Sequence, residues 1–107
     1  MNASDNPKIT NVNHLANLEI LLARNDMGVN DICGINDAGI AQCIKSESLD
    51  VPNNSKIKNV NHLVKLEILD ASGACGINDA GLVQCINLRS LDAAHNTKSQ
   101  KIDKKTT

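Results

Sequence analysis

The chain has 107 residues, a formal net charge of -1 at neutral pH, and no Phe, Tyr or Trp. This length corresponds to one domain, in which Leu, Ile, Val, Ala and Cys must fill the interior, an arrangement that suits a stack of flat aliphatic layers. The nearly balanced charge disfavours nucleic acid as a partner. We expect no membrane partner and an intracellular, cytoplasmic protein, because neither a signal peptide nor a transmembrane segment is recognisable.

An internal repeat dominates the sequence. Residues 8–22 agree with residues 56–70 at 11 of 15 positions, and residues 33–50 agree with residues 75–92 at 13 of 18. The chain therefore alternates two types of unit in the order A, B, A, B. The first three units are 26, 22 and 20 residues long, and the four units begin at Ile9, Ile35, Ile57 and Ile77. These units are too short for helical arrays, whose repeats have ~33 residues or more.

Each unit predicts a turn and a short helix followed by a strand. Two residues after each leading Ile stands a potential helix N-cap, namely Asn11, Asp37, Asn59 and Asp79. The alternation in Ser48-Leu49-Asp50-Val51 predicts a short parallel strand whose Leu49 and Val51 face the core. The alignment stacks apolar residues into core columns, among them Val12, Ala38, Val60 and Ala80, and also Leu21, Leu49, Leu69 and Leu91.

The stretch from Leu88 to Asn96 follows the pattern LxxLxLxxN, and residues 49–54 match the second half of the same pattern. The chain resembles the leucine-rich-repeat family across roughly residues 1–96, and its B units are similar to the cysteine-containing repeats of F-box leucine-rich-repeat proteins. The resemblance implies an α/β solenoid of about four repeats, with short parallel strands on the concave side and short helices or turns on the convex side. Departures from the pattern are Asp26, Ala74, Ser46 and an inserted, irregular stretch at residues 27–32.

The repeats suggest three parts of the chain. Residues 1–8 align with the strand half of a repeat, residues 9–96 hold the repeats, and residues 97–107 form a polar, Lys-rich tail. No polar cap precedes the first unit, although repeat proteins normally shield their terminal units. We interpret the chain either as a fragment of a longer array or as a short member whose ends meet a partner, with end-to-end self-association as a further option. We expect no F-box among these 107 residues, because the repeats and the tail leave no room for one.

The four cysteines invite comparison with a zinc site. Equivalent sulfurs two units apart lie ~10 Å from each other, whereas the thiolates around one zinc lie within ~4 Å. We therefore predict no metal site, with Cys43 and Cys85 filling core positions of leucines and Cys33 and Cys75 partly buried. A disulfide is also disfavoured in the reducing interior of a cell.

The three histidines suggest no catalytic site. His14 and His62 occupy the same position in the two A units, where we predict solvated side chains on helix faces. His95 follows a predicted strand, but no motif fixes a nucleophile or carboxylate beside it. We assign no catalytic residue and no cofactor, and we expect that the protein is not an enzyme.

The outward-facing strand residues form columns on the predicted concave sheet face, which is acidic with apolar spots. Aspartates ~4.8 Å apart repel each other by only ~0.9 kcal/mol per pair in water, so the acidic column needs no ligand. Aspartate is also common at this position in the family pattern, and a divalent cation is a lesser alternative ligand. The predicted partner-binding residues are Glu19, Ile20, Leu22, Arg24, Glu47, Asp50, Glu67, Ile68, Asp70, Arg89 and Asp92.

These residues predict a non-enzymatic protein–protein interaction module. The concave sheet face would bind an unidentified protein partner with a basic surface, and isoleucines would supply desolvated contacts. The alternative is a truncated fragment of a longer adaptor, for example a substrate-recognition subunit of a ubiquitin ligase, with little activity alone.

Overall fold

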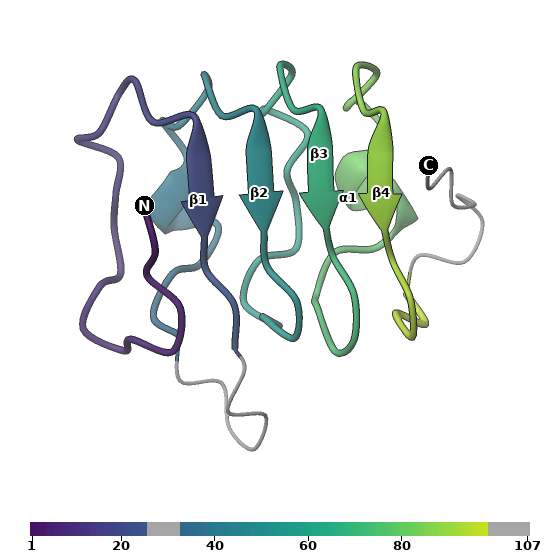
Figure 1. The fold of residues 1–107 in the computed structure, drawn as a ribbon, viewed down its shortest axis with the longest axis horizontal. Coiled ribbons are helices and arrows are strands. Elements are labelled where there is room, and N and C mark those ends of the chain that lie inside the picture. Colours follow the sequence, from purple (N-terminus) through teal and green to yellow (C-terminus); the bar gives the residue numbers. More distant parts are fainter. Residues whose placement is uncertain (26–32, 99–107) are drawn as a thin grey trace.

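The computed structural model describes residues 1–25 and 33–98. They form a small α/β domain in which four parallel strands make one open sheet in the order β1-β2-β3-β4 (Figure 1). The strands are β1 (Ile20–Leu22), β2 (Ser48–Asp50), β3 (Ile68–Asp70) and β4 (Ser90–Asp92). Two short helical segments lie behind the sheet, the 3-10 helix η1 (Ala38–Ile40) and the α-helix α1 (Asp79–Leu82).

The central leucine of each strand points into the core. The parallel register pairs these residues across the sheet in the order Leu21, Leu49, Leu69 and Leu91. All four are at most 2% exposed, which confirms the predicted column. A strand of three residues directs only its middle side chain to this face, so the two flanking side chains point to the other face.

The N-terminal residues extend the sheet beside β1. Asn2 forms a parallel bridge with Leu22. The N–H of Ala3 donates to the carbonyl oxygen of Leu22, and the N–H of Leu22 donates to that of Met1, both at 2.8 Å. Ala3 is 1% exposed and joins the core. Residues 1–3 therefore take a strand position, in agreement with the sequence alignment.

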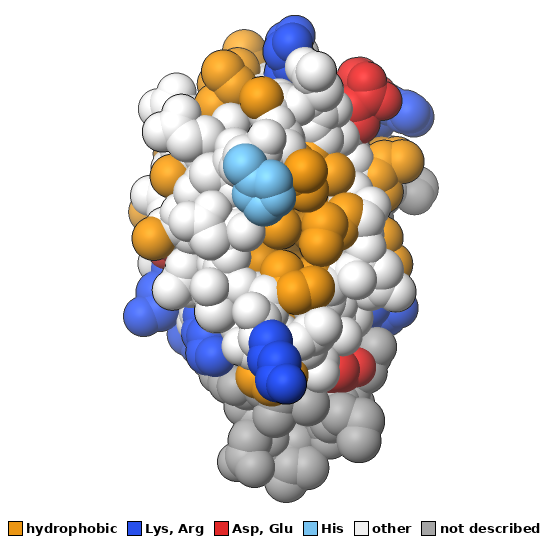
Figure 2. Space-filling model, turned by 90° about the vertical axis from the view of Figure 1, so that its left-hand side faces the viewer, with side chains coloured by type: hydrophobic (Ala, Val, Ile, Leu, Met, Phe, Trp, Pro, Cys, Tyr) orange, Lys and Arg blue, Asp and Glu red, His pale blue; other side chains and the backbone are white. Residues whose placement is uncertain are grey.

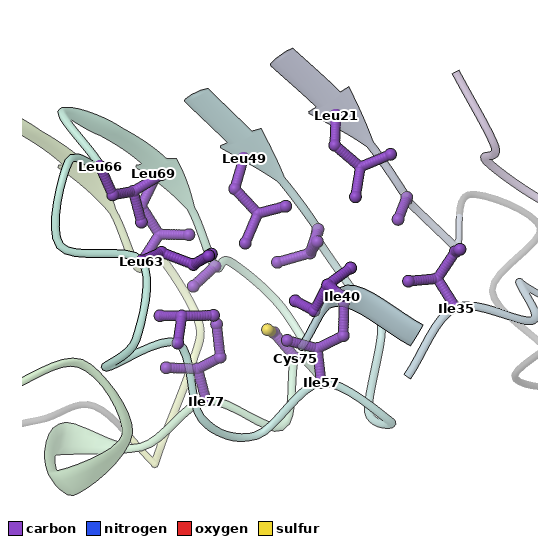
Figure 3. Packing of buried hydrophobic residues seen from close by; sticks show 14 of the residues in the cluster. Leu21, Ile35, Ile40, Leu49, Ile57, Leu63, Leu66, Leu69, Cys75 and Ile77 are labelled. Carbon is purple, nitrogen blue, oxygen red and sulfur yellow. The ribbon is translucent and has the colours of Figure 1, made fainter. Parts of the chain in front are cut away.

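The wall opposite the sheet differs between the two types of unit. In unit one the N–H of Leu15 donates to Val12 and the N–H of Leu18 donates to Leu15, each at 3.0 Å, and unit three repeats these bonds. The A units thus form successive turns instead of helices, while the B units contain η1 and α1. Figure 3 shows aliphatic side chains from the strands and from this wall meeting in one layer.

Of the predicted helix caps of the B units, Asp79 is wrong by one residue, and Asp37 stands at the N-cap position of η1 but makes no capping hydrogen bond with its side chain. The side chains of Asn36 and Asn78 accept hydrogen bonds from the N–H groups of Gly39 and Gly81 at 2.9 and 2.8 Å. Asp79 is instead the first residue of α1. The preceding asparagine reaches the third N–H group after it, which is the usual geometry of a cap.

The remaining predicted caps have other roles. The carboxylate of Asp37 accepts a hydrogen bond from the N–H of Lys58, in the next unit, at 2.8 Å. Asn11 and Asn59 each accept from the N–H group two residues later, at 2.8 and 2.9 Å. These side chains stabilise turns and the contact between units, because the A units have no helix to cap.

One predicted core column is also wrong in the B units. Val12 and Val60 are buried as expected, but Ala38 and Ala80 are exposed. The buried side chains lie two residues later, at Ile40 and Leu82, which are 0% and 4% exposed. The two additional residues of a B unit wind into a helical turn, and this turn shifts the inward-facing position along the chain.

Glycines allow the backbones of neighbouring units to approach closely. A Cβ atom on Gly39 would overlap the carbonyl oxygen of Thr10, and one on Gly81 would overlap that of Lys58. The carbonyl of Gly81 accepts a hydrogen bond from the N–H of Val60 at 2.7 Å. The repeated Ala-Gly of the B units is therefore a consequence of packing between the backbones of successive units.

Buried asparagines connect the strand ends to the opposite wall. The Nδ2 of Asn54 donates to the carbonyl oxygens of Ala23 and Ile35 at 2.9 and 3.3 Å, and its Oδ1 accepts from the N–H of Lys56 at 2.9 Å. Asn96 repeats this arrangement two units later. The predicted irregular stretch at residues 27–32, the departure at Asp26 and residues 99–107 of the predicted tail lie outside the described residues.

Leu69→Ala tests the central core column. Leu69 is 1% exposed in an inner strand, so its truncation should lower the free energy of unfolding by roughly 2 to 5 kcal/mol. Urea denaturation followed by circular dichroism would measure the change. Ile68→Ala is the matched control, because Ile68 is 41% exposed on the same strand and its truncation should cost much less. Equal stability of Leu69→Ala and the parent would contradict the register.

Candidate functional site

The outward side of the sheet brings the predicted partner-binding residues together. The register places Ile20, Ser48, Ile68 and Ser90 in one column, and Leu22, Asp50, Asp70 and Asp92 in the next. Glu19, Glu47, Glu67 and Arg89 form a third column, because each of the last three donates its backbone N–H to the carbonyl of the preceding member. With Arg24, which follows β1, these residues make up the surface that we call the sheet face.

The sheet face combines a strong negative charge with two exposed aliphatic side chains. It carries six carboxylates and two guanidinium groups, a formal excess of four negative charges in a chain whose net charge is only -1. Ile20 and Ile68 are 53% and 41% exposed and belong to the same column. Acidic groups around aliphatic side chains suit a basic, partly apolar partner.

Both arginines of the sheet face pair with carboxylates. The Nε of Arg89 lies 3.0 Å from the Oε1 of Glu67, and the Nε of Arg24 lies 3.7 Å from the Oδ2 of Asp50. These are exposed or half-exposed pairs, so each contributes little to stability. Glu19, Glu47 and Asp92 remain exposed and acidic on the same surface.

The aspartate column has a structural role that the sequence interpretation missed. The Oδ1 of Asp70 accepts hydrogen bonds from the N–H and the hydroxyl of Ser72 at 3.1 and 2.7 Å. The Oδ1 of Asp92 accepts from the N–H of Ala94 at 3.0 Å, and Asn2 makes the same contact with Ser4. The aspartate at the end of β2, β3 and β4 was the available signal, because Asx side chains commonly bond the N–H two residues later.

The cysteines lie in the core. Cys43 and Cys85 are 1% and 5% exposed, as predicted, but Cys33 and Cys75 are 1% and 0% exposed, so their predicted partial burial is wrong. Both belong to the hydrophobic core cluster, and the Cys33 thiol donates to the carbonyl of Ala3, in the preceding segment, at 3.3 Å. All four are free thiols.

Burial also changes the acidity of these thiols. It raises the pKa of Cys75 from 9.0 to about 11, with a smaller contribution from the charge of Asp70. Burial likewise raises the pKa of Cys43 and of Cys85. A protonated, covered thiol is a poor nucleophile and a poor metal ligand. Within residues 1–25 and 33–98, no three His, Cys, Asp or Glu side chains are grouped so that they could hold a metal ion.

The histidines differ from the prediction in two respects, the burial of His62 and the absence of a helix at both positions. His14 is exposed, but His62 is half-buried and its Nε2 lies 3.1 Å from the carbonyl oxygen of Ile40. A carbonyl only accepts hydrogen bonds, so Nε2 carries the proton, and the contact joins unit three to unit two. The A units lack helices, so neither residue lies on a helix face. His95 is exposed and has a positive φ of 65°.

Thiol labelling tests the burial of the cysteines. In the native protein at pH ~8, Cys75 should be almost entirely protonated as well as covered, and labelling by Ellman's reagent should be slow until the chain unfolds. Because Cys75 is 0% exposed, the reagent should reach it only when the chain opens. The matched control is Ala94→Cys, which places a thiol at an exposed position and should label at once. Rapid labelling of the parent in its folded state would contradict the core assignment.

Two further findings bear on the function. Among the helices in the described parts of the chain, none is long and apolar enough to cross a membrane. Comparison of the chain with protein-family models, with curated proteins and with solved structures finds no significant match.

Proposed function

We propose that this chain is a non-enzymatic protein–protein interaction module of the leucine-rich-repeat type, whose sheet face binds a basic protein segment. The observation that carries the proposal is the sheet face itself. Three columns of outward side chains, held in register by four parallel strands, present acidic and aliphatic groups side by side.

The repeat supports the solenoid assignment. Each unit of 20 to 26 residues in the first three contributes one strand and one return segment. The strands follow one another in chain order in the sheet, and every strand contacts only its sequence neighbours. A quasi-one-dimensional stack of this kind presents its strand side as an extended binding surface.

The rigidity of the sheet face favours binding. Its side chains project from strands whose central leucines are buried, so a partner need not order the backbone on which they stand. Successive side chains within a column are ~4.8 Å apart, one on each strand, whereas alternate side chains of an extended peptide are ~6.8 Å apart. We therefore expect a partner that spans several strands with more than one basic side chain.

Charge and apolar contact have different roles in the proposed complex. The carboxylates of Glu19, Glu47 and Asp92 would accelerate the approach of a basic partner and select against acidic ones. Ile20 and Ile68 would be desolvated on binding and would supply most of the affinity. A shallow hollow of about 330 Å³ adjoins the charged column of the sheet face and is lined by Glu47, Lys65, Glu67, Asn87 and Arg89.

The test uses a fluorescent peptide of alternating Lys and Leu as the basic probe and one of alternating Asp and Leu as the acidic probe. Anisotropy should show binding of the basic peptide that weakens with added salt, and much weaker binding of the acidic peptide. Equal binding of both peptides would contradict the proposal.

Substitutions taken from the same columns separate the two contributions. Ile20→Ser with Ile68→Ser, which copies Ser48 and Ser90, should weaken binding about tenfold. Glu47→Arg, which copies Arg89, should weaken it several-fold and reduce the salt dependence. The control for the charge is Gln42→Arg with Gln84→Arg. This double variant changes the net charge by +2, as Glu47→Arg does, but on exposed residues of the opposite wall. Equal losses in the control and in Glu47→Arg would exclude the sheet face.

A further inference from the structure

The last described unit leaves an apolar surface beside β4. A hollow of about 210 Å³ there is lined mainly by side chains of unit four. Val83 and Ile86 are 60% and 83% exposed, and Leu88 is half-buried. We call Leu82, Cys85 and Leu88, of which only Leu88 is more than 5% exposed, the C-terminal end face.

The same surface is covered where it occurs inside the protein. Unit two is also a B unit, and its residues Ile40, Cys43 and Ser46, equivalent to Leu82, Cys85 and Leu88, are 0%, 1% and 2% exposed. Unit three, an A unit, covers them, and two of its polar contacts with unit two lie on this side. His62 donates to the carbonyl of Ile40, and Asp37 accepts from the N–H of Lys58. The structure thus shows which surface fits on the outer side of a B unit.

Unit one is an A unit, and no described residue covers the outer side of its apolar wall as unit two covers that of unit three. Figure 2 shows the β1 end of the molecule, with apolar side chains gathered near a histidine. Ile9, Leu15 and Leu18 are half-buried there, and we call them the N-terminal end face. Their equivalents in unit three are at most 1% exposed because unit two covers them, namely Ile57, Leu63 and Leu66.

The two end faces are therefore the two halves of one interface that the protein already contains. We propose that copies of this chain associate head to tail, with the C-terminal end face of one copy on the N-terminal end face of the next. The contact would repeat the one between units two and three. His14 would then donate to the carbonyl of Leu82 of the neighbouring copy, as His62 does to Ile40. Because the contact joins two different surfaces, every complex keeps one free N-terminal and one free C-terminal end face. Further copies can therefore add to it.

Close stacking requires one segment to move. Residues 91–98 have the same conformation as residues 1–8. Asp5 and His95 have φ values of 58° and 65°, and the side chains of Asn6 and Asn96 each accept from the N–H two residues later, at 2.9 Å. Both segments occupy the same position in the stack. In the head-to-tail complex, residues 91–98 of one copy would replace residues 1–8 of the next.

This replacement conserves most of the hydrogen bonds. In residues 1–8, Met1 and Ala3 form backbone hydrogen bonds with Leu22, and the carbonyl of Asn6 accepts from the N–H of Gly34 at 3.1 Å. Residues 49–56, which are equivalent to 91–98, offer the same groups to unit three, where the carbonyl of Asn54 accepts from the N–H of Gly76 at 3.1 Å. The exchange loses the hydrogen bond from the N–H of Arg24 to the hydroxyl of Ser4, at 3.0 Å, because Ala94 takes the position of Ser4, so the burial of the end faces must drive it.

The charges of the sheet face also fit across the junction. Replacement of residues 1–3 by β4 aligns Arg89 of one copy with Glu19 of the next, so the guanidinium lies between Glu67 and Glu19. Asp92 comes beside Leu22, which avoids one more pair of neighbouring aspartates. The junction is therefore electrostatically favourable, although exposed pairs of this kind contribute little individually.

Sedimentation of the full chain tests the proposal, with interference detection because the chain has no aromatic residues. The average mass should rise above 11.4 kDa as the concentration increases from the micromolar to the millimolar range. Leu18→Glu alone and Leu88→Glu alone should remain monomeric, because each blocks one end. An equal mixture of the two should form a dimer and nothing larger, because the mixture restores one unmodified interface. A constant monomer mass for the parent, or an inert mixture of folded variants, would overturn the proposal.

Two control variants place the same charge outside the interface. Ala16→Glu and Ile86→Glu correspond to Val64 and Ile44, which stay 51% and 53% exposed inside the protein, so both variants should still associate. Circular dichroism melts would establish that all variants fold. If Ile86→Glu blocked association as fully as Leu88→Glu, non-specific hydrophobic contact would explain the result and the proposed interface would be wrong.

Hydrogen exchange tests the displaced segment. In the associated sample, the amides of residues 1–8 should exchange faster than in the monomer, and those of residues 91–98 should exchange more slowly. Unchanged protection of residues 1–8 in a sample that is mostly associated would overturn the replacement. None of these measurements depends on the peptide binding of the sheet face.

Discussion

The close approach of successive backbones is the constraint on which the rest of the structure depends. Each strand contributes one leucine to the core, and the chain has no aromatic side chain to fill a wider gap. Neighbouring units must therefore lie so near each other that Gly39 and Gly81 have no room for a Cβ atom. No unit can bury its apolar side chains without its neighbours, so stability is shared along the stack.

The sequence predicts the sheet well because the repeated signal there is unambiguous. Leu21, Leu49, Leu69 and Leu91 stand at equivalent positions of nearly identical segments, and any shift by one residue would turn them to solvent. The opposite wall is less predictable. The alignment places Ala38 and Ala80 in the core, whereas Ile40 and Leu82 lie there, because a helical turn and a chain of tight turns cover different numbers of residues over the same distance.

Contacts between units explain the other errors. Whether Asp37 caps its own helix or binds the N–H of Lys58 depends on how closely unit three approaches, and local sequence does not contain that distance. The same holds for His62, whose partner is the carbonyl of Ile40. The full burial of Cys33 and Cys75 likewise results from the segments packed on either side of them.

The candidate site was predictable in its membership but not in the role of each member. Alternation along a strand identifies the outward side chains, and the register confirms their columns. The aspartates, however, have a local reason to be there, since Asp70 and Asp92 close turns at the strand ends. Ile20 and Ile68 have no such reason. Their place in one column of the sheet face is the feature on which the proposed apolar contact rests.

The two proposed interactions use different surfaces and reinforce each other. Head-to-tail association would continue the columns of the sheet face from one copy to the next, because β4 and β1 would be neighbours in one parallel sheet. A basic partner long enough to cross the junction would then meet two sets of isoleucines and carboxylates. Its second contact would be intramolecular, so a weak interaction per copy would become a strong one per assembly. Binding would in turn favour association, since the partner would bind the assembled form more tightly than the monomer.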